Sequence, residues 1–249
     1  MKIAFIFIVK DGEQYLERNL NLLKRHNQDI YAVENNSTDD TKNILKNSNI
    51  KQVTTLNLDK NHSLELCKNE RINCTERVRR LAYIRQQGLN SVIASGINYD
   101  YVCMLDMDFV KYDENGLNDM FTYMEEHQDV DAIFGMSVQT LYGGIPYDTA
   151  AIKPLYKVLP IIFKFNRYVE VDSAFSGFGV YRFSSIYNTK ATYDYQNITD
   201  IEHIQFNSNF NKLIVDTKFN PVYNPSYHIS KPALVLIFIV LLILILPTK

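Results

Sequence analysis

Apolar runs alternate with amphipathic stretches through the first half of the chain. Residues 3–9 are apolar without interruption, which predicts a strand buried on both faces of a sheet. Residues 13–25 carry Leu16, Leu20 and Leu23 at helical spacing, which predicts a helix with one buried face. The chain therefore begins with a strand followed by a helix, the unit from which parallel sheets are built.

The same alternation continues beyond this first pair of elements. Further strands are predicted at residues 29–33, 53–58, 101–105 and 132–138, and further helices at residues 41–47, 76–88 and 116–127. Gly88 is expected to end its helix, because glycine is favoured just after a helical C-terminus. This order predicts an α/β fold of Rossmann-like type, with a mostly parallel central sheet flanked by helices. Ligands of such sheets bind beyond the carboxyl ends of the strands.

The C-terminal segment has a different character. Residues 233–246 include no polar side chain and are bracketed by Lys231 and Lys249. As a helix the run would be about 21 Å long, against roughly 30 Å for a hydrocarbon core, a difference that snorkelling lysines could offset. We therefore expect a domain at residues 1–228 and a hydrophobic helix at residues 229–249 that anchors the protein to a membrane. A buried core helix or strand is the alternative.

Composition narrows the class of protein. At 249 residues, with 46% hydrophobic and 22% charged residues, the chain suits one globular domain. The net charge of −2 argues against a nucleic-acid partner. The three cysteines, Cys67, Cys74 and Cys103, form no CxxC pair. We therefore expect neither a zinc site nor a disulfide framework, and a reducing compartment.

Two aspartates stand directly after the predicted strand at residues 101–105. Asp106 and Asp108 leave the sheet at its carboxyl edge, separated by Met107. Carboxylate oxygens at this spacing can hold Mg²⁺ or Mn²⁺ together with the oxygens of a diphosphate. We therefore predict a metal and nucleotide site here, and an ordinary acidic surface loop is the alternative.

Two further elements offer groups that suit a nucleotide. The polar loop at residues 34–41 follows the second strand and presents carboxylate, amide and hydroxyl groups, although Ser37 or Thr38 could instead cap the next helix. The helix at residues 76–88 carries four arginines. Of these, Arg80 and Arg85 are predicted to pair with phosphate oxygens, whereas a solvated basic face is the alternative.

These three elements together resemble the family 2-like glycosyltransferases of the GT-A fold. Residues 33–41 are similar to the V-[DE]-[DN]-[GN]-S-T-D-x-T loop of that family, and residues 85–89 to its R-N-x-G-[LI] helix, with Gln86 in place of Asn. Residues 99–108 resemble its DYV…LDxD strand. The order and spacing agree across roughly the first 110 residues.

The resemblance implies where a nucleotide-sugar would bind. Glu34 and Asn35 would contact the base or the ribose, although Asn35 stands where Asp is common, which leaves recognition of uracil open. Asp106 and Asp108 would engage the metal ion and the diphosphate. The residues predicted to bind the nucleotide-sugar are Val9, Glu34, Asn35, Asn36, Arg80, Arg85, Asp106, Met107, Asp108, Gly177 and Gly179.

A looser likeness reaches further along the chain, to fungal capsule-associated and α-mannosyltransferases and their viral relatives. It is carried by residues 35–39, 147–149, 176–182 and 202–207. Gly177 and Gly179 would let the backbone approach the sugar closely, or would form a bare turn.

The resemblance also suggests catalytic and metal-binding residues in the second half. Glu202 would face the acceptor and act as general base if the reaction inverts configuration, or have a positional or nucleophilic role if it retains configuration, with Asp200 and Asp172 in reserve. GT-A enzymes often add a histidine to the metal site, and His228 is preferred here over His203. An ordinary loop histidine is the alternative.

The predicted protein is a metal-dependent glycosyltransferase that uses Mn²⁺ or Mg²⁺. It would move a hexose from a UDP- or GDP-sugar to a hydroxyl group of a glycan, protein or lipid. Residues 36–38 form a glycosylation sequon, and a lumenal glycan there would block the donor site, so the catalytic domain is expected in the cytosol. Nucleotidyl transfer is disfavoured, because residues 9–13 are not a Gly-rich basic loop. A membrane-anchored protein that binds nucleotide-sugars or glycans without turnover is the remaining alternative.

Overall fold

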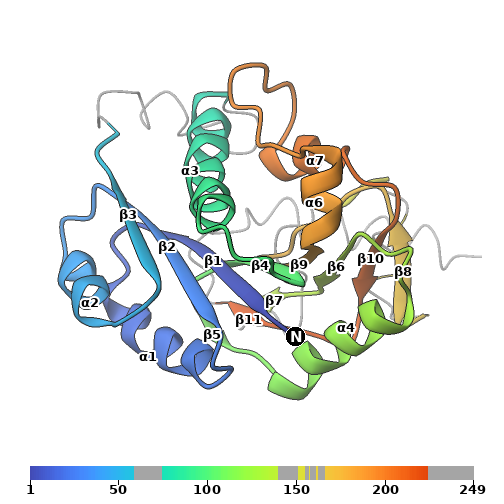
Figure 1. Cartoon of the computed structure of the whole chain (residues 1–249), viewed down its shortest axis with the longest axis horizontal. Coiled ribbons are helices and arrows are strands. Elements are labelled where there is room, and N and C mark those ends of the chain that lie inside the picture. The colour runs from blue at the N-terminus through green and yellow to red at the C-terminus, as the bar shows by residue number, and fades with distance from the viewer. Residues whose placement is uncertain (59–74, 140–150, 155–156, 158–160, 162–165, 224–249) are drawn as a thin grey trace, which may run out of the picture.

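The computed structural model describes residues 1–58, 75–139, 151–154, 157, 161 and 166–223. Within these ranges the chain forms the α/β architecture drawn in Figure 1. The strands are β1 (Ile3–Val9), β2 (Asp29–Asn35), β3 (Gln52–Leu56), β4 (Tyr101–Asp106), β5 (Phe109–Lys111), β6 (Ala132–Gly135), β7 (Val138–Gln139), β8 (Tyr168–Val171), β9 (Phe178–Arg182), β10 (Leu213–Asp216) and β11 (Val222–Tyr223). The helices are α1 (Glu13–Lys24), α2 (Thr41–Asn47), α3 (Thr75–Ala94), α4 (Glu114–Glu126), α6 (Phe183–Thr189) and α7 (Glu202–Asn207).

The central sheet of the described residues has eight strands in the order β3-β2-β1-β4-β9-β6-β10-β8. Strands β3, β2, β1 and β4 pair in parallel, and β10 pairs in parallel with β6. Strand β9 runs antiparallel between β4 and β6, and β8 runs antiparallel at the edge. All strands except β9 and β8 therefore share one direction, and the predicted mostly parallel sheet is confirmed.

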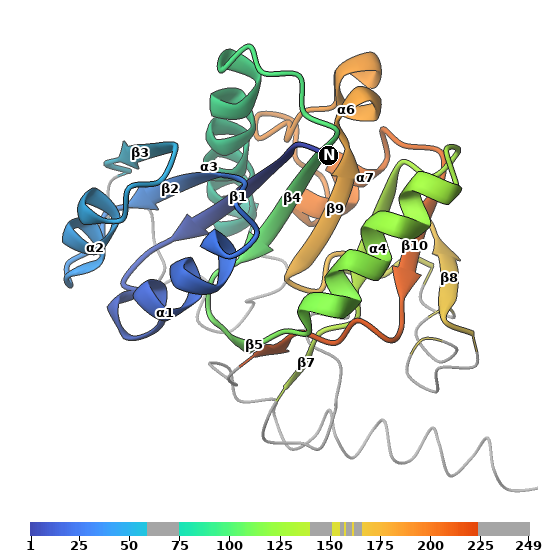
Figure 2. The same cartoon turned by 60° about the horizontal axis from the view of Figure 1, so that its bottom comes forward.

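Helices cover both faces of this sheet. Figure 1 and Figure 2 show α3, α6 and α7 on one face and α1, α2 and α4 on the other. Strand β1 serves both layers, because Ala4 and Ile6 join the core under α3 while Phe5 and Phe7 join the core under α1. This burial on both faces explains why residues 3–9 are apolar without alternation.

A second, small sheet lies next to the carboxyl edge of β4. It has the order β5-β11-β7, with β11 antiparallel to β5 and parallel to β7. Figure 2 shows β5 and β7 beyond the ends of β1 and β4. The predicted strand at residues 132–138 is divided between the two sheets, because β6 belongs to the central sheet and β7 to the small one. Past the end of β6 the chain pairs with the segment that leads into β11: Met136 N donates to Phe219 O and Val138 N to Pro221 O, each at 2.8 Å.

Helix α3 is longer than the sequence predicts. It passes through Gly88 and ends at Ala94, so the expectation that Gly88 ends the helix is wrong. A Cβ atom at Gly88 would lie 2.6 Å from Ile6 Cγ2 and 3.3 Å from Val33 Cγ2. The helix can approach β1 and β2 closely because residue 88 has no side chain. A sequence pattern does not distinguish such a packing glycine from a glycine that ends a helix.

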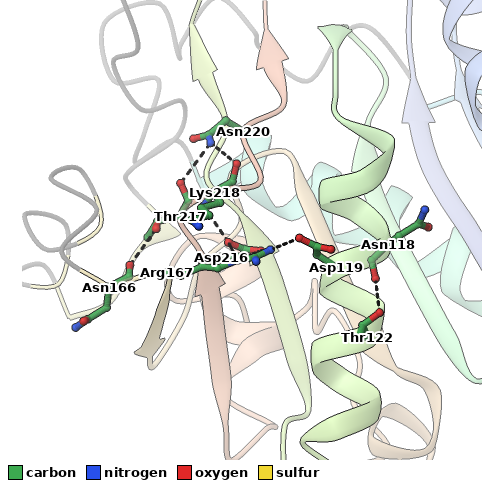
Figure 3. A network of polar contacts seen from close by, with 9 residues as sticks. All are labelled: Asn118, Asp119, Thr122, Asn166, Arg167, Asp216, Thr217, Lys218 and Asn220. Atoms are coloured by element: carbon green, nitrogen blue, oxygen red, sulfur yellow. Dashed lines mark hydrogen bonds and ion pairs between the residues drawn. The ribbon is translucent and has the colours of Figure 1, made fainter.

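A polar network ties the far end of the sheet to α4, as Figure 3 shows. Arg167, which precedes β8, meets the buried carboxylate of Asp216 through Nε and Nη2 at 3.0–3.3 Å. Its Nη2 atom also donates to Asp119 Oδ2 on α4 at 2.6 Å. The hydrogen bonds that Arg167 donates to Asp216 and, with a smaller effect, to Asp119 raise the pKa of Arg167. Burial lowers this pKa, but by less than the contact with Asp216 raises it. The network therefore fixes β8, β10 and α4 relative to one another.

The membrane prediction lies outside the part of the chain that the structure describes. Residues 229–249, the predicted hydrophobic helix, and the predicted domain boundary at residue 228 both fall beyond residue 223. None of the helices in the described ranges has the length and hydropathy of a membrane span.

Candidate active site

The two predicted metal-binding aspartates lie in the turn between β4 and β5. Asp106 is the last residue of β4, and Asp108 directly precedes β5. The backbone of the turn is tied to the neighbouring strand connection, since Asp106 N donates to Gly177 O at 2.8 Å. Because β4 lies in the middle of the sheet, the turn projects from its carboxyl edge, where α/β sheets bind ligands.

Helix α1 holds the other side of this turn. Asn19 is fully buried and donates its side-chain amide to Met107 O at 2.6 Å and to Phe109 O at 2.8 Å. Arg18 Nη2 donates to the same Phe109 carbonyl at 2.6 Å. These hydrogen bonds set the path of the backbone between the two aspartates, so the carboxylates are positioned by groups outside the turn.

Arg85 joins two of the predicted site residues. From α3 its Nη2 atom donates to Asp106 Oδ1 at 3.0 Å, and its Nε atom donates to Glu202 Oε1, at the start of α7, at 3.3 Å. The Arg85 and Glu202 side chains are only 8% and 6% exposed. Burial opposes the charge of the guanidinium, but Asp106 and Glu202 outweigh it and raise the pKa of Arg85 above its usual value. Arg85 is therefore positively charged, and its hydrogen bonds hold it between the carboxylates of Asp106 and Glu202.

An aromatic stack supports this arginine. The Arg85 guanidinium carbon lies 4.8 Å from the centre of the Phe175 ring, and the His203 ring stacks on Phe175 with centroids 3.5 Å apart. His203 Nδ1 is 3.2 Å from the Tyr193 hydroxyl. Burial, and secondarily the charge of Arg85, lower the pKa of His203 well below its usual value. His203 is therefore neutral and acts here as a packed ring behind the ion pairs.

The aspartate turn suits a divalent cation. Burial, and then the neighbouring charge of Asp106, raise the pKa of Asp108 to about 6. A hard cation would stabilise the two neighbouring carboxylates, whose oxygens are the ligands that Mg²⁺ and Mn²⁺ prefer. No group of three or more His, Cys, Asp or Glu side chains within the described ranges could hold a metal ion. The predicted third ligand, His228, lies outside these ranges.

The polar loop after β2 reaches the same edge of the sheet. The strand register pairs Ile8 with Asp106 and Val9 with Glu34, so the end of β1 lies between the loop and the aspartate turn. With strands about 4.8 Å apart, Glu34 and Asp106 are separated by roughly 10 Å across β1. The prediction that these segments share one edge of the sheet is confirmed.

The side chains of this loop mostly shape the loop itself. Glu34 is fully buried, with Oε1 accepting from Ser37 N at 2.6 Å, and Asn35 Oδ1 accepts from Leu58 N at 3.2 Å. Asn36 has a left-handed backbone (φ 55°) and donates its side-chain amide to Leu58 O. Contacts of Glu34, Asn35 and Asn36 with a nucleotide stay a prediction, and the burial of Glu34 leaves it little surface for a ligand.

The alternative prediction, that Ser37 or Thr38 caps the next helix, is wrong. Helix α2 begins at Thr41, whose N–H donates to Asp39 Oδ1 at 3.1 Å. Ser37 Oγ instead accepts from Asp11 N at 3.0 Å, and Thr38 N donates to Asp11 Oδ1 at 2.7 Å. Ser37 and Thr38 therefore tie the loop to the β1–α1 connection, and Asp39 is the loop residue that meets the first N–H of α2.

Other predicted site residues lie apart from the ion pairs. Asp200 is exposed and accepts from Ile201 N at 2.8 Å, and within the described residues it makes no contact with Arg85 or Glu202. Arg80 is half-buried on α3, five residues and thus about 140° around the helix from Arg85. His228 lies outside the described residues.

Two more predicted residues have packing roles that the sequence pattern did not suggest. Met107 is buried in the core under α1. Gly179 pairs with Met104 inside the sheet, and a Cβ atom there would lie 2.9 Å from the Phe134 ring. Packing thus explains the glycine at residue 179, and its predicted approach to a sugar stays a prediction.

The sequence reasoning missed several residues that build the site. Asn19 and Arg18 brace the aspartate turn, Phe175 supports Arg85, and Tyr223 hydrogen-bonds to the turn from β11. A polar Asn at a core-facing position of the first helix was a usable signal, since buried amides need partners. Phe175 and Tyr223 carried no such signal, because aromatic residues are common throughout the chain.

Comparison with known proteins adds a likeness in fold. No model of a protein family matches the sequence, and no curated protein matches it. Among solved structures, a mycobacterial protein superposes with a TM-score of 0.51 at 10% identity, over 89% of this chain and 66% of its own. The chain thus spans just under two thirds of that protein's length. This likeness is one of fold, and the mostly parallel sheet flanked by helices fits the GT-A type.

The predicted α/β fold, with a mostly parallel central sheet flanked by helices, is confirmed. Glucosyl-3-phosphoglycerate synthase from Mycobacterium tuberculosis is a weaker match, with a TM-score of 0.48 at 11% identity over 89% of this chain and 70% of that one. That enzyme was solved with Mn²⁺, uridine diphosphate and glucosyl-3-phosphoglycerate, and in another structure with Mg²⁺ and uridine diphosphate.

Proposed function

We propose that the chain is a metal-dependent glycosyltransferase that moves a hexose from a nucleotide-diphosphate sugar to a hydroxyl group of a glycan, protein or lipid. The observation that supports it most is the buried contact of Arg85 with Asp106 and Glu202. These partners lie 21 and 117 positions away in the sequence, so the three residues come from three different elements. A desolvated cluster at the carboxyl edge of a parallel sheet is typical of a functional site rather than of a stabilising surface pair.

The layout of the edge fits an extended donor. In the proposal, the base and ribose lie along the loop after β2, and the diphosphate reaches the Asp106–Asp108 turn across the end of β1. The separation of roughly 10 Å between Glu34 and Asp106 suits a ligand of that length. Glu34 shapes the loop through Ser37, and the partly exposed Asn36 is left to face the nucleoside.

The charged residues divide the work in this proposal. Asp106 and Asp108 would hold Mn²⁺ or Mg²⁺, and a bound cation neutralises the charge that develops on the departing nucleoside diphosphate. Arg85 orients the Asp106 carboxylate through the 3.0 Å contact. Glu202 is nearly buried and paired, so the proposal assigns it to orient Arg85 rather than to accept a proton from the acceptor.

The acceptor and the membrane are further parts of the proposal. The apolar run at residues 233–246 supports an anchor at residues 229–249, which would bring the enzyme to acceptors at a membrane surface. The sequon at residues 36–38 supports a cytosolic catalytic domain, as argued from the sequence.

Donor hydrolysis by the full-length chain tests the proposal. The protein is incubated with a panel of UDP- and GDP-hexoses in the presence of Mn²⁺ or of EDTA, and release of UDP or GDP is measured. We expect metal-dependent release from one donor, lowered about a hundredfold or more in Asp106→Asn and Asp108→Asn. Asp129→Asn is the matched control, because the Asp129 carboxylate is exposed on the surface, where it pairs with Lys212 at 2.6 Å.

Two outcomes would contradict the proposal. A folded chain that neither binds nor cleaves any donor excludes the glycosyltransferase. Metal-dependent binding of a nucleotide-sugar without release of the diphosphate, in the presence of acceptor extracts, would favour the binding protein without turnover.

A further inference from the structure

The small sheet brings Tyr223, far along the chain, against the aspartate turn. Tyr223 ends β11 and is fully buried. It pairs in antiparallel register with Phe109, the residue that directly follows Asp108. One end of the turn is therefore joined to β11 through the strand pairing.

The side chain of Tyr223 reaches the other end of the same turn. Its hydroxyl donates to Gly177 O at 2.8 Å and lies 3.3 Å from Asp106 O. The Gly177 carbonyl also accepts from Asp106 N at 2.8 Å. The phenol hydroxyl and the N–H of Asp106 thus share one acceptor, and a single residue contacts both sides of the Asp106–Asp108 turn.

The backbone at Gly177 is adapted to this contact. Gly177 has a φ of +79°, a conformation that side chains other than glycine rarely adopt. A Cβ atom there would lie 2.7 Å from the hydroxyl oxygen and from the ring carbon that bears it in Tyr223. The glycine therefore makes room for the phenol, which gives residue 177 a role in shaping the turn.

We propose that Tyr223 is a positioning residue that sets the spacing of the Asp106 and Asp108 carboxylates for a divalent cation. This inference rests on the proposed function, because it takes the turn to be the metal site. Groups that orient metal ligands without touching the ion strongly influence the affinity for the metal, because the cation accepts only a narrow range of oxygen positions. Tyr223 acts on the cation through the backbone and touches neither the metal ion nor the donor.

Mn²⁺ binding to the full-length chain tests this role. Tyr223→Phe removes the hydroxyl and keeps the ring that packs on Gly177. The matched control is Tyr31→Phe, which removes another buried, hydrogen-bonded hydroxyl, 2.8 Å from that of Tyr99. Free Mn²⁺ is titrated by electron paramagnetic resonance with UDP or GDP present, and thermal unfolding is recorded for each protein.

We expect Mn²⁺ affinity to fall about tenfold in Tyr223→Phe and to stay unchanged in Tyr31→Phe. Wild-type affinity in Tyr223→Phe, or an equal loss in both variants, would overturn the role of Tyr223 and leave the proposed function standing. If the wild-type chain binds no Mn²⁺ with either nucleotide, the metal site itself is wrong, and both proposals fail.

Discussion

Two arginines in this molecule each face two carboxylates, and their surroundings differ. Arg167 meets the fully buried Asp216 with two nitrogen atoms and reaches Asp119 at the surface, where that side chain is 55% exposed. Arg85 is itself almost buried and gives one nitrogen atom to Asp106 and one to Glu202. Figure 3 shows the Arg167 group in a corner between β10 and α4.

The difference lies in how completely the charge is compensated. The one buried carboxylate of the Arg167 group is met by a two-pronged contact, which is the strongest arrangement for such a pair. In the Arg85 group, a third carboxylate, that of Asp108, stands beside Asp106, and burial together with Asp106 raises the pKa of Asp108 to about 6. The carboxylate in excess around Arg167 is that of Asp119, which is exposed to water, whereas a cation would stabilise the excess carboxylate at Asp108. This contrast separates a structural ion pair from a candidate site.

The largest effect is expected on stability from Arg167→Met. Without the arginine, the Asp216 carboxylate would remain buried and unpaired, which should lower the free energy of unfolding by about 3–5 kcal/mol. Urea denaturation of the full-length chain measures this loss. In Arg25→Met, where the pair with Glu114 is exposed, we expect a change within about 0.5 kcal/mol. Similar losses in both variants would remove the distinction between the Arg167 group and a surface pair.

A smaller effect, on turnover rather than on folding, is expected from Arg85→Lys. Lysine keeps the charge, but its single ammonium lacks the planar fork that reaches Asp106 and Glu202 together. We expect release of nucleoside diphosphate to slow about 10- to 100-fold, which corresponds to about 1.4–2.7 kcal/mol. Arg79→Lys, on the same helix and paired with Glu76, should retain its rate. Equal rates in Arg85→Lys and wild type would place Arg85 with Arg167 as a structural residue.

The smallest effect concerns acid, and it should arise in the Arg85 group. His203 is buried beside Arg85, Glu202 and Tyr193, and its pKa is lowered well below the usual 6.5. Below pH 6.5 the unfolded chain therefore binds a proton that the folded chain does not, and stability falls as the pH decreases. The slope from this histidine reaches at most about 1.4 kcal/mol per pH unit.

Unfolding measured from pH 7 to pH 5 in wild type and in His203→Gln checks this expectation. The stability of the variant should depend less steeply on pH than that of the wild type. His26, whose pKa burial also lowers, contributes to the pH dependence that remains. An unchanged slope in His203→Gln would show that acid acts elsewhere in the molecule.

Much of the fold was predictable because its signals are local. The uninterrupted apolar run of β1 and the helical spacing of Leu16, Leu20 and Leu23 on α1 each reflect burial along one element. The end of α3 was mispredicted because Gly88 reports contact with Ile6 and Val33 on other strands. A glycine that ends a helix and a glycine that lets a helix approach a sheet look alike in sequence.

The candidate site divides in the same way. The aspartates after β4 and the polar loop after β2 were predictable from their position at strand ends, and Arg85 from its resemblance to a known helix motif. The brace of Asn19 and the contact of Tyr223 were not, since each depends on which element packs beside the turn. The raised pKa of Asp108 likewise follows chiefly from burial, which no short motif measures.

The sequence by itself determined the alternation of strands and helices, the direction of most strands, and the edge at which the polar residues gather. These properties follow from periodicity and from the fixed geometry of parallel strands. Only the tertiary structure decided that Arg85 pairs with Asp106 and Glu202, that Glu34 is buried, and that β9 inserts antiparallel between β4 and β6. Such contacts join residues distant in the chain, and their energies depend on desolvation and exact spacing that arise only when the elements pack together.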